Sequence, residues 1–398
     1  MWNILGHPMT PYAVSIWAGC ILALGLFLYE GRKLKPAALL WTAGLGILLG
    51  LLGARLYYVL ARFSIFTEIG LFENFFAAAD EDLKAWGAAK GAAFWGAVGG
   101  VSLGALLAGK ITKERVSALL DALAPGAALG IAVSRFGEFS IGEGIGPGVE
   151  EEGLQFFPLA VQNEWGEWYY ALFLLEGLVG VVIFVLLMTR GRKLTDGYRA
   201  RMFLILYASC QIVLEAVRRD NFLRWLFVRV SQLASAAVLL GLVIFGLIRW
   251  ARKRGSRGTA GRLISKTLLE LVKMLVPFFA VLILYWLLIL GQPLVEDGAL
   301  VSPGALWWKL ITSGWPLTIL GLLGLLALLL AKRPGSETMT EKQAALRTAA
   351  FIIPAVIVIA MEFGIDKSAD LPEALGYLTE AVCCCVMGTA AWQIAMKN

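Results

Sequence analysis

The 398-residue chain is strongly apolar: 59% of its residues are hydrophobic, 16% are charged, and its mean hydropathy is +0.75. Soluble domains carry about 25% charged residues, so this composition excludes a soluble globular protein. The formal net charge is +6, but the basic residues stand in short groups between apolar runs. That distribution excludes a nucleic-acid-binding surface as the reason for the charge, and we expect no nucleic-acid partner.

Continuous apolar runs recur along the whole chain and predict membrane-spanning helices. A hydrocarbon layer about 30 Å thick needs about 20 helical residues, and continuous runs are unlike the alternating pattern of barrel strands. The residues before the first run contain no Lys or Arg, so we expect the first helix to be a permanent span and not a signal peptide. Eleven spans are predicted, at residues 11–30, 38–60, 92–109, 116–134, 168–188, 202–218, 231–250, 268–290, 315–331, 346–362 and 376–395.

The charges between these spans predict the topology. The basic groups fall in loops on one side of the membrane, and the positive-inside rule makes that side cytoplasmic. The loops on the other side are acidic or rich in glycine. We therefore expect the N-terminus outside and the C-terminus in the cytoplasm. The basic groups are residues 32–35, 110–115, 190–201, 249–266 and 332–333.

A domain boundary is predicted near residues 252–261, which read RKRGSRGTAG. Gly, Ser and Arg in this density do not pack a core. Seven expected helices precede the segment and four follow it. We predict a first domain over residues 1–250, a basic cytoplasmic linker over 251–266 and a four-helix membrane domain over 267–398.

The five cysteines give no sign of a disulfide or a metal site. All lie inside apolar runs, where small packing residues are the expected use. No metal and no cofactor are predicted. The cysteines are Cys20, Cys210, Cys383, Cys384 and Cys385.

Small residues recur at four-residue spacing in the second, third and fourth expected spans. This spacing lets membrane helices approach each other closely. Close helix packing is therefore the simplest interpretation of these glycines, which are Gly46, Gly50, Gly96, Gly100, Gly104, Gly126 and Gly130.

Charged residues inside the spans are the first candidates for function, because charge is costly in lipid. Arg55, Arg135, Glu176, Glu215 and Arg218 all fall at or near the outer ends of expected helices. Arginines grouped at one membrane surface suit an anionic phospholipid headgroup, since guanidinium is a planar donor to phosphate oxygens. The alternative is that each arginine snorkels to the interface or neutralises a neighbouring carboxylate.

A glycine-rich segment follows Arg135 and reads FGEFSIGEGIGPG over residues 136–148. So many glycines end a helix and let the backbone approach a ligand, with amides free for an oxyanion. A flexible outer loop is the alternative interpretation.

These residues resemble the signature of the bacterial prolipoprotein diacylglyceryl transferase family. The family places an Asp and a Pro in a helix, followed by Gly-Arg-x-Gly-Asn-Phe-x-Asn-Gly-Glu-x-x-Gly. Residues 119–126 (LLDALAPG), 134–137 (SRFG) and 142–146 (GEGIG) resemble this pattern. The resemblance covers about residues 1–250, and its further matches are residues 11–12 (PY), 53–58 (GARLYY), 99–100 (GG), 175–177 (LEG), 207–218 and 231–235 (SQLAS).

The resemblance implies a fold, an activity and partners. The expected fold is an all-α polytopic membrane protein, with a seven-helix diacylglyceryl-transferase-like bundle and four extra C-terminal transmembrane helices. The expected enzyme is a transferase of lipoprotein biosynthesis in the bacterial cytoplasmic membrane. It moves a diacylglyceryl group from phosphatidylglycerol to the lipobox cysteine of a prolipoprotein and releases glycerol phosphate at the outer face.

The chain departs from the family at three polar positions. Val98 stands where the family has His, Glu138 where it has Asn, and Gln211 where it has Arg. Since thioether formation requires a deprotonated thiol, we expect Glu138 or Glu143 to replace the missing base; the lone histidine, His7, is the less favoured candidate. The predicted catalytic residues are Glu138, Glu143, Tyr12 and Glu215, and the predicted phospholipid-binding residues are Arg135, Arg218, Arg55, Gly99, Gly100 and Gly146.

Two other functions remain open at this point. One is an altered or inactive family member that binds anionic phospholipid or uses a different acceptor. The other is a transporter, which is less favoured because the two halves show no repeat and the polar residues lie at the outer surface rather than the midplane.

Overall fold

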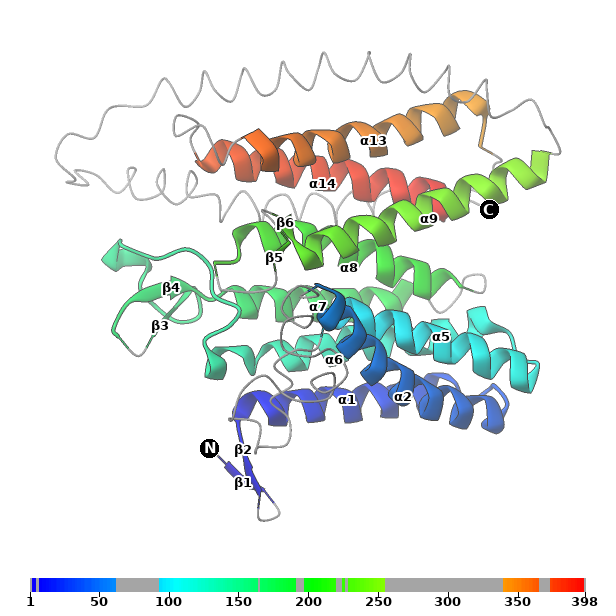
Figure 1. The fold of residues 1–398 in the computed structure, drawn as a ribbon, viewed down its shortest axis with the longest axis horizontal. Coiled ribbons are helices and arrows are strands. Elements are labelled where there is room, and N and C mark those ends of the chain that lie inside the picture. The colour runs from blue at the N-terminus through cyan, green and yellow to red at the C-terminus, as the bar shows by residue number, and fades with distance from the viewer. Residues whose placement is uncertain are drawn as a thin grey trace. The chain divides into compact units, whose positions relative to one another are not determined.

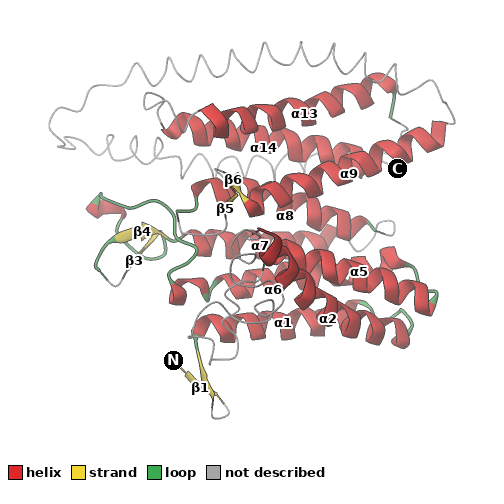
Figure 2. Cartoon of the chain, viewed as in Figure 1, coloured by secondary structure: helices red, strands yellow, loops and turns green. Residues whose placement is uncertain are grey.

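The computed structural model describes residues 2–4, 7–61, 93–163, 165–190, 197–219, 224–225, 228–254, 339–364 and 373–396. These residues are mainly helical, with one short two-stranded hairpin before the first helix and others between helices (Figure 2). The chain divides into two compact units. The first contains residues 1–203 and 218–231, and the second contains residues 204–217 and 232–398.

In its described residues, the first unit contains five long helices and three hairpins, which Figure 1 labels. Its hairpins pair β1 (Trp2–Ile4) with β2 (His7–Met9), β3 (Ala160–Gln162) with β4 (Trp168–Tyr170), and β5 (Arg224–Trp225) with β6 (Val228–Arg229), all antiparallel. Its helices are α1 (Pro11–Glu30), α2 (Pro36–Ala61), α5 (Phe94–Thr112), α6 (Val116–Arg135) and α7 (Leu172–Arg190), with short 3-10 turns η2 (Glu138–Ile141) and η3 (Glu152–Leu154).

The helix α8 (Tyr198–Val217) begins in the first unit and continues in the second, and Arg218 follows it. The second unit also contains α13 (Glu341–Gly364), α14 (Glu373–Ala395) and all of α9 (Val230–Arg254) from Gln232 onward. Each of these helices matches an expected span. The expected spans at 268–290 and 315–331 and the predicted linker lie outside the described residues, so the total of seven plus four helices stays a prediction.

Six of the described helices are long and apolar enough to cross a membrane: α1, α2, α5, α6, α7 and α9. Their outward faces carry many exposed Leu and Ile side chains, as expected of surfaces that contact lipid tails. The chain is therefore a multi-pass membrane protein. Helix starts differ from the expected ones by up to five residues: residues 168–170 form β4 so that α7 begins at Leu172, and α8 and α13 begin earlier than expected.

Glycines bring two helix pairs into close contact, as their spacing predicted. A Cβ on Gly126 of α6 would lie 2.5 Å from the carbonyl oxygen of Ala23 in α1. A Cβ on Gly100 of α5 would collide with the carbonyl oxygen of Leu49 in α2. Backbones this close gain dispersion contacts that larger residues would prevent.

A carboxylate from α6 fixes the beginning of α8. Asp121 accepts hydrogen bonds from the amides of Gly197 (2.6 Å) and Ala200 (2.9 Å), the first turn of α8. Negative charge at this position satisfies donors that lack helical partners and complements the helix dipole. Arg199 Nη1 adds an ion pair to Glu30 Oε2 of α1 at 2.7 Å. These contacts fix the starting point of the helix that leads to Arg218.

The second unit is joined by buried polar contacts between its helices. Gln232 Nε2 of α9 donates to the carbonyl oxygen of Ile212 in α8 at 3.2 Å. Trp250 Nε1, near the end of α9, donates to the carbonyl oxygen of Met339 at 2.7 Å, just before α13. Such bonds satisfy backbone carbonyls that have no water partner in lipid.

Candidate active site

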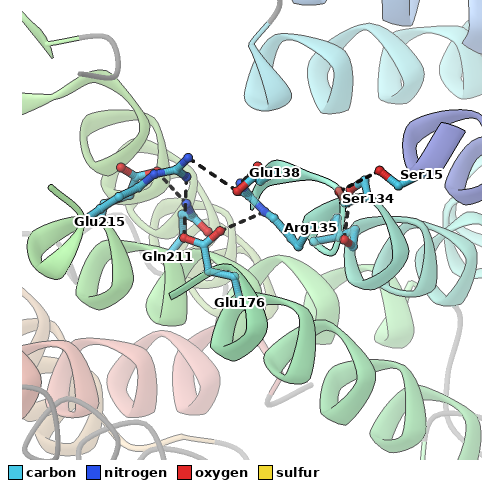
Figure 3. Close-up of polar contacts among 9 residues, drawn as sticks. Ser15, Ser134, Arg135, Glu138, Glu176, Gln211 and Glu215 are labelled. Atoms are coloured by element: carbon cyan, nitrogen blue, oxygen red, sulfur yellow. Dashed lines mark hydrogen bonds and ion pairs between the residues drawn. The ribbon is translucent and has the colours of Figure 1, made fainter. Parts of the chain in front are cut away.

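The candidate site lies in the first unit, where α6 ends and α1 begins. Gly137 makes this junction possible, since a Cβ there would collide with Ser15 Oγ and would lie 2.8 Å from the Cα of Tyr12. The Tyr12 amide donates to Ser140 Oγ at 3.1 Å, and Ser15 Oγ donates to the Ser134 carbonyl at 3.2 Å (Figure 3). The turn η2 is thereby held against the first turn of α1.

Two arginines and two glutamates form a closed ring of alternating charge, which we call the four-residue ring. Arg135 Nη1 pairs with Glu138 Oε1, and Arg135 Nε lies 2.9 Å from Glu176 Oε2 (Figure 3). Arg218 Nη2 lies 3.5 Å from Glu138 Oε2, and Arg218 Nη1 lies 3.6 Å from Glu176 Oε1. Each arginine therefore contacts both carboxylates.

The ring is buried, and its formal charge is zero. The side chains of Arg135, Glu138, Glu176 and Arg218 are 13%, 8%, 2% and 1% exposed. Burying one ion costs on the order of several kcal/mol unless an opposite charge and hydrogen bonds compensate it. Alternation of charge supplies this compensation for all four groups, and it explains how α6, η2, α7 and the end of α8 bring ionised side chains together.

The two arginines differ in how tightly the carboxylates hold them. The contacts from Arg135 fall within hydrogen-bond distance, whereas those from Arg218 exceed the usual 2.7–3.2 Å range for N–H to oxygen. Among the described residues, Glu138 Oε2 accepts no hydrogen bond. Both sides of the ring that meet at Arg218 are thus looser than the two that meet at Arg135.

The glycine-rich segment is held by backbone hydrogen bonds. The amides of Gly142, Glu143 and Gly146 donate to the carbonyls of Phe139 (3.2 Å), Glu138 (3.2 Å) and Tyr170 (2.9 Å). The expectation that the amides here are free for an oxyanion was therefore wrong for these three residues. It failed because their acceptors lie partly in a distant strand, which the local sequence does not reveal.

The same segment connects the elements that carry the ring. The Gly144 carbonyl accepts from the amide of Phe173 at 2.7 Å, and the Ile145 carbonyl accepts from the amide of Arg219 at 3.0 Å. Gly144 has φ +70°, and a Cβ there would lie 2.7 Å from Glu138 Oε2. The segment thus positions Glu138 against the start of α7 and the residue after Arg218.

Two of the predicted catalytic residues lie beside the ring. Tyr12 occupies the first turn of α1, and its phenol lies within the electrostatic influence of Glu138, Glu143, Arg135 and Arg218. Glu143 is half-buried in the segment that follows η2. His7 belongs to β2, and its side chain lies outside what the structure describes.

Glu215 lies on α8 in the second unit and is 1% exposed. Its Oε1 accepts a hydrogen bond from Gln211 Nε2, one helical turn earlier, at 2.7 Å. The shared helical face predicted for these residues is confirmed for this pair. In the chain, Glu215 precedes Arg218 by three residues.

Four predicted lipid-binding residues are not members of the four-residue ring. The Arg55 guanidinium lies over the ring of Tyr58, 5.4 Å from its centroid. Gly100 is occupied by the contact between α5 and α2, whereas a Cβ on Gly99 would meet nothing within 4 Å. Of the six residues predicted to bind phospholipid, the structure places Arg135 and Arg218 in one ring, and Gly146 lies in the segment beside it.

Two residues of this region were missed or undervalued in the sequence. Glu176 was recognised as a charge inside a span but was not assigned to the site. The signal available in the sequence was its position inside the apolar run that forms α7. Arg229 of β6 is 4% exposed and donates from Nη2 to the carbonyl of Arg218. Nothing in the sequence indicates this contact, because it depends on the β5–β6 hairpin.

Comparison with known proteins places these residues in a family. The sequence profile of the family described as Prolipoprotein diacylglyceryl transferase matches residues 1–248. Proteins named phosphatidylglycerol–prolipoprotein diacylglyceryl transferase from Streptococcus pyogenes serotype M5 (strain Manfredo), serotype M49 (strain NZ131) and serotype M1 are each 30% identical over 258 residues. The alignments cover 62% of this chain and 92% of each relative. Since the family profile matches more than half of the chain, the chain belongs to the prolipoprotein diacylglyceryl transferase family.

Proposed function

We propose that this protein transfers a diacylglyceryl group from phosphatidylglycerol to the cysteine thiol of a prolipoprotein signal peptide at the outer face of the bacterial cytoplasmic membrane. The observation that carries the proposal is the burial of Arg135 and Arg218 in one ring, in a family whose relatives are named for this reaction. Guanidinium groups keep their charge in low dielectric and bind phosphate oxygens through paired donors.

The reaction breaks one bond and forms one. The cysteine sulfur attacks the glycerol carbon that bears the phosphate, and a carbon–sulfur thioether bond forms. The carbon–oxygen bond to the phosphate breaks, and its electron pair leaves with glycerol phosphate. Negative charge grows on the leaving oxygen, so Arg135 and Arg218 would stabilise the transition state more than the ground state.

The thiol proton needs an acceptor in this chain, where Val98 replaces the family histidine. We assign this role to Glu138 or Glu143, both within the electrostatic surroundings of Tyr12. Tyr12 and Glu215 complete the proposed catalytic set, with Tyr12 positioned to orient the reacting groups beside η2. Arg55 and the glycines at 99, 100 and 146 are proposed to contact the lipid.

We extend the proposal to the organisation of the chain. The transferase domain spans residues 1–250, which agrees with the extent of the family match. Residues 251–266 form a basic cytoplasmic linker, and residues 267–398 form a four-helix membrane domain. The basic loops support an outer N-terminus and a cytoplasmic C-terminus.

The test is a single-turnover reaction with defined substrates. The purified full-length protein is incubated with isotope-labelled phosphatidylglycerol and a peptide containing a lipobox cysteine. Mass spectrometry is expected to show a diacylglyceryl adduct on the cysteine, with glycerol phosphate released in equal amount. A peptide in which cysteine is replaced by serine serves as control. Absence of the adduct under conditions in which the lipid binds would contradict the proposal.

One observation favours a second candidate, a family member that binds phospholipid without transferring it. In the described structure, two carboxylates already neutralise both arginines. If neither carboxylate ever left the two arginines, the lipid phosphate would find no free guanidinium N–H donors. The same assay separates the two functions, because this candidate predicts lipid binding with no adduct.

A further inference from the structure

The charge of the four-residue ring sets a condition on lipid binding. Two guanidinium groups face two carboxylates, so the ring is neutral before any ligand arrives. Adding a lipid phosphate would give the ring a net negative charge among groups that are almost fully buried, which is costly in low dielectric. A phosphate can join both arginines at low cost only if one carboxylate gives up its place.

The two carboxylates are not equally able to leave. Both hold Arg135 within hydrogen-bond distance and contact Arg218 less closely, Glu138 at 3.5 Å and Glu176 at 3.6 Å, so their ion pairs do not distinguish them. Their positions do: Glu176 lies within the long helix α7 with its side chain 2% exposed, against 8% for Glu138. Glu138 lies on the four-residue turn η2, next to a segment whose Gly142 and Gly144 both have positive φ. Its Oε2 faces Arg218 Nη2 at 3.5 Å without accepting a hydrogen bond from any described residue.

Glu138 also lies on a short turn at the surface of helix α1 and not within a long helix. The turn η2 directly follows α6, at the end of the first unit where α1 begins, and its Ser140 Oγ contacts the Tyr12 amide. Gly144 lets the carboxylate occupy its present position, since a Cβ there would lie 2.7 Å from Glu138 Oε2. Because Glu138 is more exposed and lies on a four-residue turn, displacing its side chain disturbs fewer packed neighbours than displacing that of Glu176 within α7.

We propose that Glu138 is an exchangeable counter-ion: the phosphate of the incoming lipid takes its place on Arg135 and Arg218, and the displaced carboxylate remains beside the site. The proposal rests on the proposed function for the identity of the lipid. It adds a step to that function, because binding of the phospholipid itself frees a carboxylate next to Tyr12. The thiol's proton acceptor is then released only when the phosphate is bound, which couples the order of binding to the chemistry.

The experiment measures binding without turnover, in purified full-length protein and in the absence of any peptide. The variant Glu138→Gln keeps the side-chain shape and removes the charge, so the ring carries one net positive charge. Glu150→Gln makes the same charge change at an exposed residue of the same connection and is the matched control. Three ligands are titrated: dioctanoyl phosphatidylglycerol, dioctanoylglycerol and inorganic phosphate.

The expected result is specific to the lipid that carries a phosphate. Glu138→Gln binds dioctanoyl phosphatidylglycerol about tenfold more tightly than the wild-type protein. The reason is that the phosphate meets two guanidinium groups from which no carboxylate of residue 138 has to be displaced. Dioctanoylglycerol binds both proteins equally, inorganic phosphate gains far less than the lipid, and Glu150→Gln behaves as wild type. Equal or weaker binding of the phospholipid by Glu138→Gln would overturn the exchange.

Two further outcomes would also overturn the proposal. An equal gain for dioctanoylglycerol would mean that the charge does not act through phosphate, and inorganic phosphate binding as tightly as the lipid would mean a free-phosphate site. Glu138→Asp guards against loss of folding, because it keeps the charge while lengthening the ion pairs. Its gain in phospholipid affinity should be intermediate, and no gain would count against exchange. Because none of these measurements involves transfer, a missing adduct would refute the proposed function alone.

Discussion

Arg135 Nε lies 2.9 Å from Glu176 Oε2, so the last residue of α6 is tied to α7 by two side chains that are 13% and 2% exposed. Arg135 Nη1 also pairs closely with Glu138 Oε1. Arg218 lies 3.5 Å from Glu138 and 3.6 Å from Glu176. The ring thus holds Arg135 closely and Arg218 loosely.

Removing the charge of Glu176 should destabilise the protein. Glu176→Gln leaves two buried guanidinium groups with only Glu138 as counter-ion, and loss of one partner from a buried pair typically costs about 3–5 kcal/mol. The measurement is unfolding in mixed detergent micelles, followed by tryptophan fluorescence. Glu152→Gln, in which an exposed residue loses the same charge, is the control. Equal stability of the two variants would contradict the assignment.

Two adjacent glycines provide a matched test of helix packing. Gly100→Ala should lower stability by about 1–3 kcal/mol, the usual cost of overpacking, because its Cβ would collide with the Leu49 carbonyl. Gly99→Ala should be neutral or slightly stabilising, since a Cβ there meets nothing within 4 Å and alanine favours helix. The same unfolding assay compares them. Equal losses would show that α5 does not approach α2 as described.

The carboxylate of Asp121 should stabilise the beginning of α8. Asp121→Ala removes the acceptor for the amides of Gly197 and Ala200, and loss of such a cap costs about 0.5–2 kcal/mol. Asp121→Asn keeps an acceptor oxygen but not the charge, so its loss should be smaller. Hydrogen exchange of the two amides measures the effect directly. Unchanged protection in Asp121→Ala would contradict the capping role.

The β3–β4 hairpin should show a pH dependence set by Glu167. Hydrogen bonds from Tyr169, and secondly from Asn163, lower the pKa of the Glu167 carboxyl from its ordinary value of 4.5. Because the pKa of Glu167 is lower in the folded state than in the unfolded state, its ionised carboxylate stabilises the hairpin above pH 4.5. This contribution disappears as the pH falls through the folded-state pKa. Carbon-13 NMR titration of Glu167 measures it. Tyr169→Phe should move the pKa back toward 4.5; an unchanged value would refute the cause.

The fold was largely predictable because membrane spans leave a simple signal. Continuous apolar runs located every described helix, and the four-residue spacing of glycines located the contacts of Gly100 and Gly126. Helices in lipid satisfy their own backbone groups, so composition alone decides where they form. The hairpin that shortened α7 was missed because Trp168–Tyr170 is as apolar as the helix it precedes.

The site was only partly predictable, because its geometry depends on segments that are not regular. Arg135, Glu138 and Arg218 were identified by type and position, but the ring also requires Glu176 from another helix. The amide of Gly146 was expected to be free, yet Tyr170 accepts its hydrogen bond. Such pairings join residues far apart in the chain, and neither spacing nor composition encodes them.

The central claim is that Arg135 and Arg218 hold the lipid phosphate while the diacylglyceryl group moves to cysteine. The most direct measurement is the single-turnover rate of glycerol phosphate release, in wild type and in Arg218→Lys. Lysine keeps the charge but loses the paired donors, so the account predicts transfer by the wild type and a rate about 100-fold lower in the variant, with the lipid still bound. Release at the wild-type rate by Arg218→Lys, or no release by the wild type, would contradict it.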